Sequence, residues 1–145
     1  MAHGNLRTAA LHTGRVLLAS LFILGGVNKI MNYEATTLTM SEMGVPFVSL
    51  LLPATIVLEF GGGMAAAIGR TGAASSAAVL FTYTLVVNLI FHRFWDMHGD
   101  MAQVELSLFF KNVSLAGGML YLAAQTAAQS DTVPNRSLGN SEERT

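Results

Sequence analysis

Four long apolar segments constrain the fold of this chain more than any other feature of its sequence. Residues 71–91 and 112–130 contain no Asp, Glu, Lys or Arg, and residues 13–31 and 47–68 contain very few. A helix needs about 20 residues to cross about 30 Å of hydrocarbon, so each segment is long enough to span a membrane. The sequence therefore predicts an all-α fold, a four-helix transmembrane bundle with short loops.

The composition agrees with a membrane protein. Of the 145 residues, 12% are charged and 52% are hydrophobic, whereas about a quarter of the residues in an ordinary soluble domain are charged. A soluble all-α core is the alternative, but four apolar segments in near succession leave little sequence for a polar surface. We expect one membrane domain over residues 1–129 and a short, polar, disordered cytoplasmic tail over residues 130–145. The expected spans cover about residues 13–31, 47–68, 71–91 and 106–127.

Basic residues predict the orientation of the bundle. Five arginines fall on the side shared by the N-terminus, the second loop and the C-terminus, and three basic residues fall on the other side. Because basic residues are enriched in cytoplasmic loops, we expect a multi-pass protein with both termini in the cytoplasm. The first group is Arg7, Arg15, Arg70, Arg136 and Arg144, and the second is Lys29, Arg93 and Lys111.

The absence of cysteine excludes several kinds of site from this chain alone. Disulfides, thiolate zinc sites, iron–sulfur clusters and CxxC redox sites all require cysteine, so a redox role would depend on another component. The formal net charge of -1 indicates no basic surface for nucleic acid. The sequence also lacks a Gly-rich phosphate-binding loop, and we expect no metal site.

One acidic residue within the second span is the first candidate for a site. Glu59 is the only charged residue between Met43 and Gly69. An acid at the centre of a membrane helix costs about 2.5 to 3.5 kcal/mol on insertion scales, so Glu59 should face the bundle interior and have a cationic partner. Depths estimated from the helical rise rank Lys111 first, then Arg15, then Lys29. The alternative is an ion pair that only fixes helix register.

Three spans carry residues at helical spacing that we expect to face inward. Arg15, Phe22 and Lys29 recur every seven residues in the first span, and Thr84, Asn88 and His92 step by four in the third. The fourth span has Lys111, Ser114, Gly118, Tyr121 and Gln125. The candidate ligand or proton site residues are therefore Glu59, Lys111, Arg15, Lys29, His92, Asn88, Asn112 and Tyr121.

Two of these features have a purely structural alternative. His92 adjoins Arg93, Phe94 and Trp95, and this group is typical of an aromatic belt at a membrane interface. Glycines cluster at residues 25–26, 61–63 and 117–118, where they predict close helix packing.

Four short motifs occur in order along most of the chain. They are RVLLASLFILGGVNK at residues 15–29, LEFGGGMAAAIGR at 58–70, HRFWDM at 92–97 and FFKNVSLAGGMLYL at 109–122. In this order they resemble the DoxX family of small four-helix membrane proteins. The resemblance implies a bacterial inner (plasma) membrane protein that is a component of an oxidoreductase, linked to quinone or thiosulfate metabolism or to oxidative stress.

Three functional classes stay open at this point. The first is a subunit or partner of a membrane redox system with a polar intramembrane pocket, for which a quinone is the candidate ligand. The second is a small-molecule or proton-linked transporter, because a mid-membrane carboxylate suits a proton site. The third is a non-catalytic membrane assembly factor. The expected partners are the lipid bilayer and either a redox enzyme or a second copy of this chain.

Overall fold

The computed structural model describes residues 2–70 and 72–131, and these are almost entirely helical. The elements are α1 (Ala2–Met31), α2 (Tyr33–Glu42), α3 (Val48–Ile68), α4 (Ala73–Phe91), a short 3-10 helix η1 (Phe94–Asp96) and α5 (Gly99–Asp131). Within this part of the chain there is no strand, and four helices are long and apolar enough to cross a membrane. The predicted all-α, four-span fold is confirmed.

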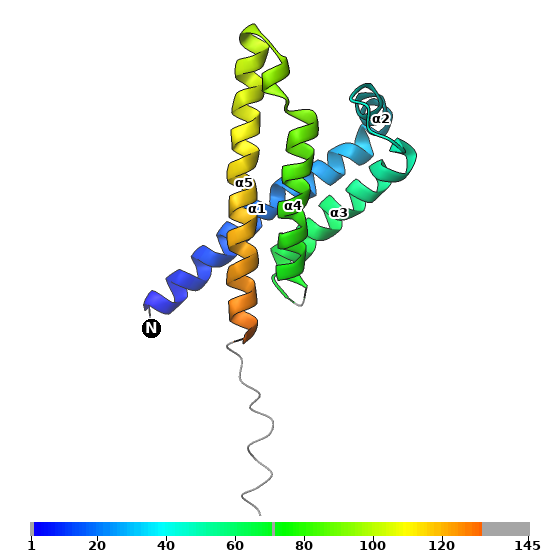
Figure 1. Ribbon diagram of the computed structural model, residues 1–145. Helices are drawn as coiled ribbons and strands as arrows, with labels where there is room; N and C mark the ends of the chain where they lie inside the picture. The colour runs from blue at the N-terminus through cyan, green and yellow to red at the C-terminus, as the bar shows by residue number, and fades with distance from the viewer. Residues whose placement is uncertain (1, 71, 132–145) are drawn as a thin grey trace, which may run out of the picture.

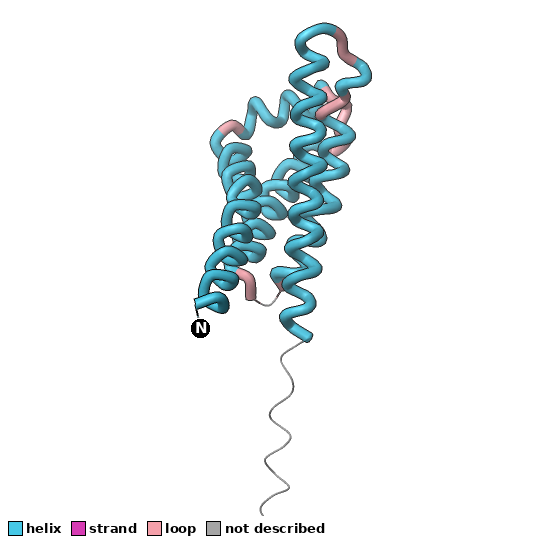
Figure 2. The backbone as a smooth tube through the Cα atoms, turned by 90° about the vertical axis from the view of Figure 1, so that its left-hand side faces the viewer, coloured by secondary structure: helices cyan, strands magenta, loops and turns pink. Residues whose placement is uncertain are grey.

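The long helices form two antiparallel pairs. The most extensive contacts join α1 to α3 and α4 to α5, and α3 also packs on α4. Figure 1 shows the α1–α3 pair running obliquely behind the α4–α5 pair, and Figure 2 shows the two pairs as adjacent layers. The start of α1 and the end of α5 lie at one end of the bundle, here named the terminal side, and α2 lies at the other, the α2 side. Which side faces the cytoplasm stays a prediction.

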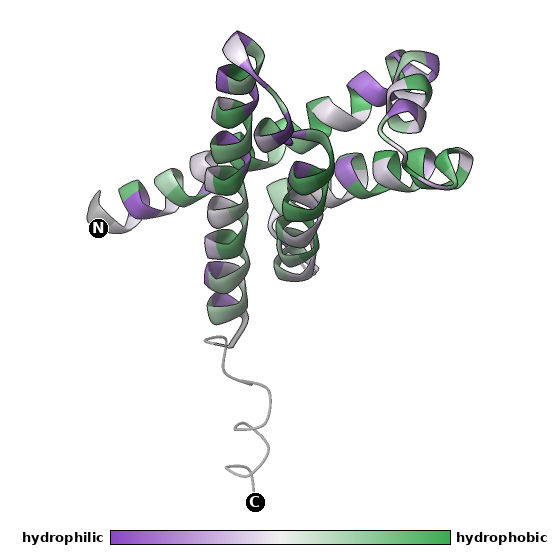
Figure 3. Ribbon diagram, turned by 45° about the horizontal axis from the view of Figure 1, so that its top comes forward, coloured by the Kyte–Doolittle hydropathy of each residue, from purple (hydrophilic) through white to green (hydrophobic). Residues whose placement is uncertain are grey.

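The helix limits differ most from the expected spans in α1 and α5. α1 begins at Ala2 rather than near residue 13, and α5 runs from Gly99 to Asp131 rather than from 106 to 127. The helical backbone continues through polar residues beyond the apolar part, because hydropathy limits the membrane crossing and not the helix. Figure 3 shows hydrophobic residues along all four long helices. The expected tail lies outside the described residues from 132 onward.

Glycines set how closely α1 and α3 approach each other. A Cβ on Gly26 would lie 2.9 Å from the Cβ of Phe60, and one on Gly63 would lie 3.0 Å from Cγ1 of Ile23. By contrast, a Cβ on Gly61 would meet nothing within 4 Å. The prediction of glycine-mediated packing is therefore confirmed at particular positions, and not at every glycine of each cluster.

The apolar core lies on the terminal side. It is built largely from small side chains of all four long helices, which allow close packing. Its buried members are Ala19, Phe22, Ala66, Ala77, Leu80, Met119, Leu122 and Ala123. This end of the bundle therefore holds the helices together, and the α2 side is less tightly filled.

Candidate ligand site

Glu59 forms an ion pair with Lys29 near the middle of the bundle. Lys29 Nζ lies 2.7 Å from Glu59 Oε2 and 2.9 Å from Oε1, so it donates to both carboxylate oxygens. The side chain of Glu59 is 8% exposed and that of Lys29 is 24% exposed. The expected inward position of Glu59 is confirmed, but the ranking of Lys111 as its partner is wrong.

The choice of Lys29 follows from the packing of α1 on α3. Gly25 lies against the carboxylate, since a Cβ there would be 3.0 Å from Glu59 Oε2, and Gly26 lies against Phe60. The last turns of α1 therefore reach only the level of the middle of α3, and α2 continues the chain beyond them. The depth estimate failed because it placed the end of the first span at the membrane boundary.

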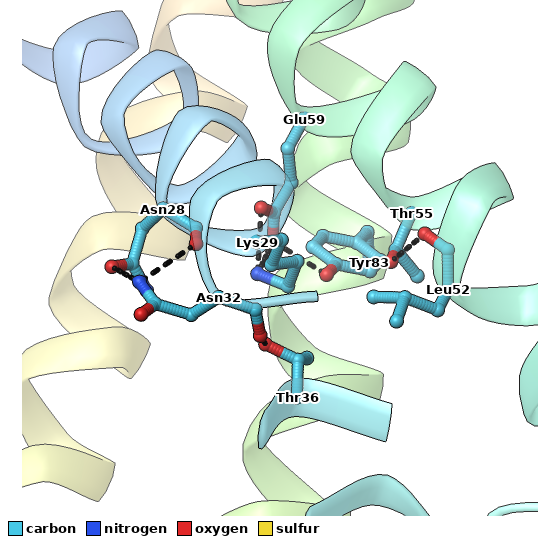
Figure 4. Close-up of polar contacts among 8 residues, drawn as sticks. All are labelled: Asn28, Lys29, Asn32, Thr36, Leu52, Thr55, Glu59 and Tyr83. Carbon is cyan, nitrogen blue, oxygen red and sulfur yellow. Dashed lines mark hydrogen bonds and ion pairs between the residues drawn. The ribbon is translucent and has the colours of Figure 1, made fainter. Parts of the chain in front are cut away.

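Tyr83 of α4 completes the polar cluster. Its hydroxyl donates to Glu59 Oε1 at 2.5 Å, and Figure 4 shows Lys29 and Tyr83 both directed at the carboxylate. Sequence reasoning missed this residue. A signal was present, because Glu59 is ten residues before Gly69 and Tyr83 is eleven after Gly72. Two residues at similar distances before and after a tight turn between antiparallel helices lie at a similar depth in the membrane.

A cavity of about 650 Å³ opens next to this cluster on the α2 side. Its polar lining includes Lys29, Tyr83 and His92, together with the amide side chains of Asn28 and Asn32. The remaining lining residues are threonines of α2 and α3 and apolar residues of α2, the α2–α3 loop, α3 and α4. They comprise Ala35, Thr36, Thr39, Met40, Val45, Leu51, Thr55, Val86, Val87, Ile90 and Phe91. A deep polar end with apolar walls is the arrangement that small-molecule sites use.

The predicted inward faces of the first and third spans are confirmed. Arg15 and Phe22 are buried and Lys29 is partly buried, while Thr84 and Asn88 are buried and His92 is partly buried. Asn88 accepts a hydrogen bond from Asn112 at 3.0 Å and donates to the carbonyl of Phe109 at 3.1 Å. These contacts join α4 to α5.

The predicted inward face of the fourth span is wrong for its charged, hydroxyl-bearing and aromatic side chains, whereas Gly118 does pack on α1, since a Cβ there would lie 2.8 Å from Cδ2 of Leu18. Lys111, Ser114 and Tyr121 are exposed on the bundle surface, and Gln125 donates to the Tyr121 hydroxyl on that same surface. The buried residues of α5 include Ala116, Met119 and Ala123, which pack closely because they are small or flexible. The buried face of α5 is therefore the one with small or flexible side chains, and not the one with polar side chains.

The other charged candidates lie away from Glu59. Arg15 donates to the Thr126 hydroxyl at 3.1 Å on the terminal side, and its guanidinium fills the space that a side chain at position 69 would need. His92 Nδ1 lies 2.8 Å from Glu105 Oε2 at the α2 side. Of the predicted set, the structure therefore pairs Glu59 with Lys29, with Tyr83 as an unpredicted third member, and it separately pairs Asn88 with Asn112.

Comparison with known proteins assigns the chain to a family. The DoxX family model matches residues 10–93, more than half of the chain. The chain belongs to the DoxX family. It is 34% identical over 121 residues to "Inner membrane protein YphA" of Escherichia coli, covering 83% of this chain and 85% of the relative. It is 38% identical over 112 residues to "Inner membrane protein YqjF" of the same organism, covering 75% and 78%. No solved structure matches.

Membership of the DoxX family and the four apolar helices agree on the location of the protein. It is a multi-pass inner membrane protein whose helices contact the lipid bilayer. Within the described residues, no group of three or more His, Asp or Glu is placed to hold a metal ion.

Proposed function

We propose that this DoxX-family protein is the ligand-binding subunit of a membrane redox system, and that its ligand is a quinone. The observation that carries the proposal is the cavity of about 650 Å³ whose apolar walls end at Lys29. This volume falls within the range of about 300 to 1,000 Å³ that small-molecule sites occupy. A quinone has a flat ring with carbonyl acceptors and an apolar tail, which match these two parts of the cavity.

The donors at the deep end suit a carbonyl group. Lys29 lines the cavity and is the more exposed partner of its ion pair, so its ammonium, which has three N–H donors, can turn to a ligand carbonyl. Asn28 and Asn32 add amide donors nearby, although Asn32 Nδ2 now donates to Asn28 Oδ1 at 2.9 Å. The apolar walls would hold the ring and the start of the tail.

Redox chemistry itself would come from a partner. With no cysteine in the chain, the residues of the cavity can bind, orient and exchange protons with a quinone, but electrons must be supplied by a redox enzyme. The proposed role is therefore to present the ligand within the membrane. Transport of a small molecule and pure assembly remain the competing functions.

Quinone binding can be measured with two matched tryptophan variants of α4. Val86 and Val79 are 51% and 48% exposed, but only Val86 lines the cavity. In lipid nanodiscs we expect Val86→Trp to weaken binding of a short-tailed ubiquinone at least about tenfold, or about 1.4 kcal/mol, because the indole fills the site. Val79→Trp should bind like the wild type. Equal loss in both variants, or no binding by the wild type, would refute the proposal and favour the assembly role.

A further inference from the structure

A second cavity lies on the other side of the polar cluster. It has a volume of about 350 Å³, is bounded by α1, α3, α4 and α5, and shares only Asn28, Tyr83 and Val87 with the lining of the first cavity. Its polar lining consists of Asn28, Glu59, Tyr83, Thr84 and Asn112. At about 30 Å³ for each water molecule, this volume has room for on the order of ten waters. The polar side chains offer hydrogen bonds to waters beside Glu59, and the rest of the lining is apolar or glycine: Leu21, Phe22, Leu24, Gly25, Val87 and Leu115.

The ion pair lies between the two cavities. Lys29 lines the first cavity but not the second, whereas Glu59 lines the second but not the first. Tyr83 lines both, and its hydroxyl bonds to the carboxylate. A ligand in the first cavity would therefore meet the cation, and water in the second would meet the carboxylate.

We propose that Glu59 is a proton-exchanging group served by the second cavity, and that it takes up one proton when a ligand in the first cavity draws Lys29 away. This inference deepens the proposed function and rests on it for the identity of the ligand. Glu59 is the twelfth of the 21 residues of α3, so it lies near the middle of that span. A carboxylate that loses its cation at such a depth is costly, and binding a proton removes the charge.

The step balances without transfer of electrons. A hydronium ion in the second cavity gives its proton to a Glu59 oxygen and becomes water, while the ammonium of Lys29 keeps its three protons and donates to the ligand. The described charged or titratable groups that face Glu59 are Lys29 from α1 and Tyr83 from α4, and α5 contributes the neutral Asn112 and Leu115. His92 lines only the first cavity.

The proton route through the second cavity to Glu59 can be tested without any ligand by replacing Lys29. In Lys29→Met, Glu59 should be protonated and give a carboxylic acid C=O band in infrared spectra, which a Lys29→Met, Glu59→Gln variant lacks. After a change from H₂O to D₂O, the shift of this band reports proton exchange. Two further Leu→Phe changes are matched, because Leu115 lines only the second cavity and Leu51 lines only the first.

We expect Leu115→Phe to slow the exchange at least about tenfold and Leu51→Phe to leave it within about twofold of the parent. Leu24→Trp provides a second block, since Leu24 also lines only the second cavity and is 65% exposed, where a larger side chain is tolerated by the fold. Exchange that is unaffected by both blocks, or slowed equally by Leu51→Phe, would overturn the route.

The coupling is tested separately in the wild type. Adding the short-tailed ubiquinone should produce the Glu59 carboxylic acid band, and Glu59→Gln should abolish it. Quinone that binds without this band would overturn the coupling while leaving the binding function intact. Quinone that does not bind would refute the proposed function, whereas the ligand-free exchange experiment would still decide the proton route.

Discussion

The terminal side and the α2 side of the bundle are packed in different ways. On the terminal side, small residues such as Ala19, Ala66 and Ala77 are fully buried and bring the helices into close contact. On the α2 side, the first cavity separates α2 from α4, and threonines and asparagines replace the alanines. One half of this small protein therefore holds the bundle together, and the other half contains the cavity in which we propose that the ligand binds. The Lys29–Glu59 pair lies at the boundary between them.

The largest effect should come from breaking the ion pair at this boundary. Lys29→Met removes the cation, so the folded protein must bury Glu59 either unpaired or with a proton taken up at neutral pH, and either state raises its free energy. The free energy of unfolding should fall by about 3 kcal/mol, the lower end of the range for buried pairs, because Lys29 is partly exposed. The measurement is unfolding by SDS in mixed micelles. Lys111→Met is the matched control, since Lys111 is exposed on α5, and it should have little effect.

The same titration gives a double-mutant cycle. Adding Glu59→Gln to Lys29→Met should recover part of the lost stability, because the amide is neutral without having to bind a proton. Additive losses would show that the pair does not couple the two helices. The Lys29–Glu59 pair would then not mark the boundary between the terminal side and the α2 side.

An intermediate effect should come from enlarging one glycine at the α1–α3 contact. Gly63→Val should destabilise the protein by about 1–3 kcal/mol, because its Cβ alone would lie 3.0 Å from Ile23 and the backbone would have to shift. Gly61→Val lies in the same triplet, where a Cβ meets nothing within 4 Å. Thermal unfolding in detergent compares the two. Similar stability of both variants would mean that close α1–α3 packing does not hold this half together.

The smallest effect should come from a polar contact of the packed half. Thr126→Val removes the hydroxyl that accepts from Arg15 and should cost about 0.6 kcal/mol, the average for side-chain hydrogen bonds within membrane proteins, and no more than about 1.7 kcal/mol. Thr82→Val is the control, because Thr82 is exposed and its hydroxyl bonds only to a carbonyl of its own helix in the described contacts. If both changes are neutral, the terminal side depends on apolar packing alone.

Much of the fold could be predicted from the sequence, and less of the site. Apolar length identified four spans because the hydrocarbon thickness imposes it. The faces of the first and third spans were also predictable, because charged or polar residues recurred there at helical spacing. The buried face of α5 was not predictable from the sequence, since it is formed by small residues such as Ala116 and Ala123. Small residues indicate an inward face less clearly than polar residues such as Lys111 and Tyr121 do, and those two are exposed.

Which cation pairs with Glu59 depends on how far α1 is shifted along the axis of α3, and the sequence of a single helix does not show this shift. Counting residues along each span places Lys29 near a membrane surface, but contacts of Gly25 and Gly26 with α3 set it beside Glu59 instead. This offset is a property of the pair of helices. Tyr83 could have been found by counting similar numbers of residues before and after the short α3–α4 turn. The two cavities, by contrast, arise only from the packing of all the helices.

The placement of the ion pair within α1 and α3 also affects how the protein enters the membrane. Chains are made from the N-terminus onward, so these two helices emerge from the ribosome before α4 and α5. Lys29 can therefore neutralise Glu59 inside the first hairpin, which offsets part of the insertion cost of about 2.5 to 3.5 kcal/mol for a lone acid. The second hairpin brings Tyr83, a neutral donor, to a carboxylate whose charge is already compensated. The ion pair of the first hairpin therefore needs no residue of the second.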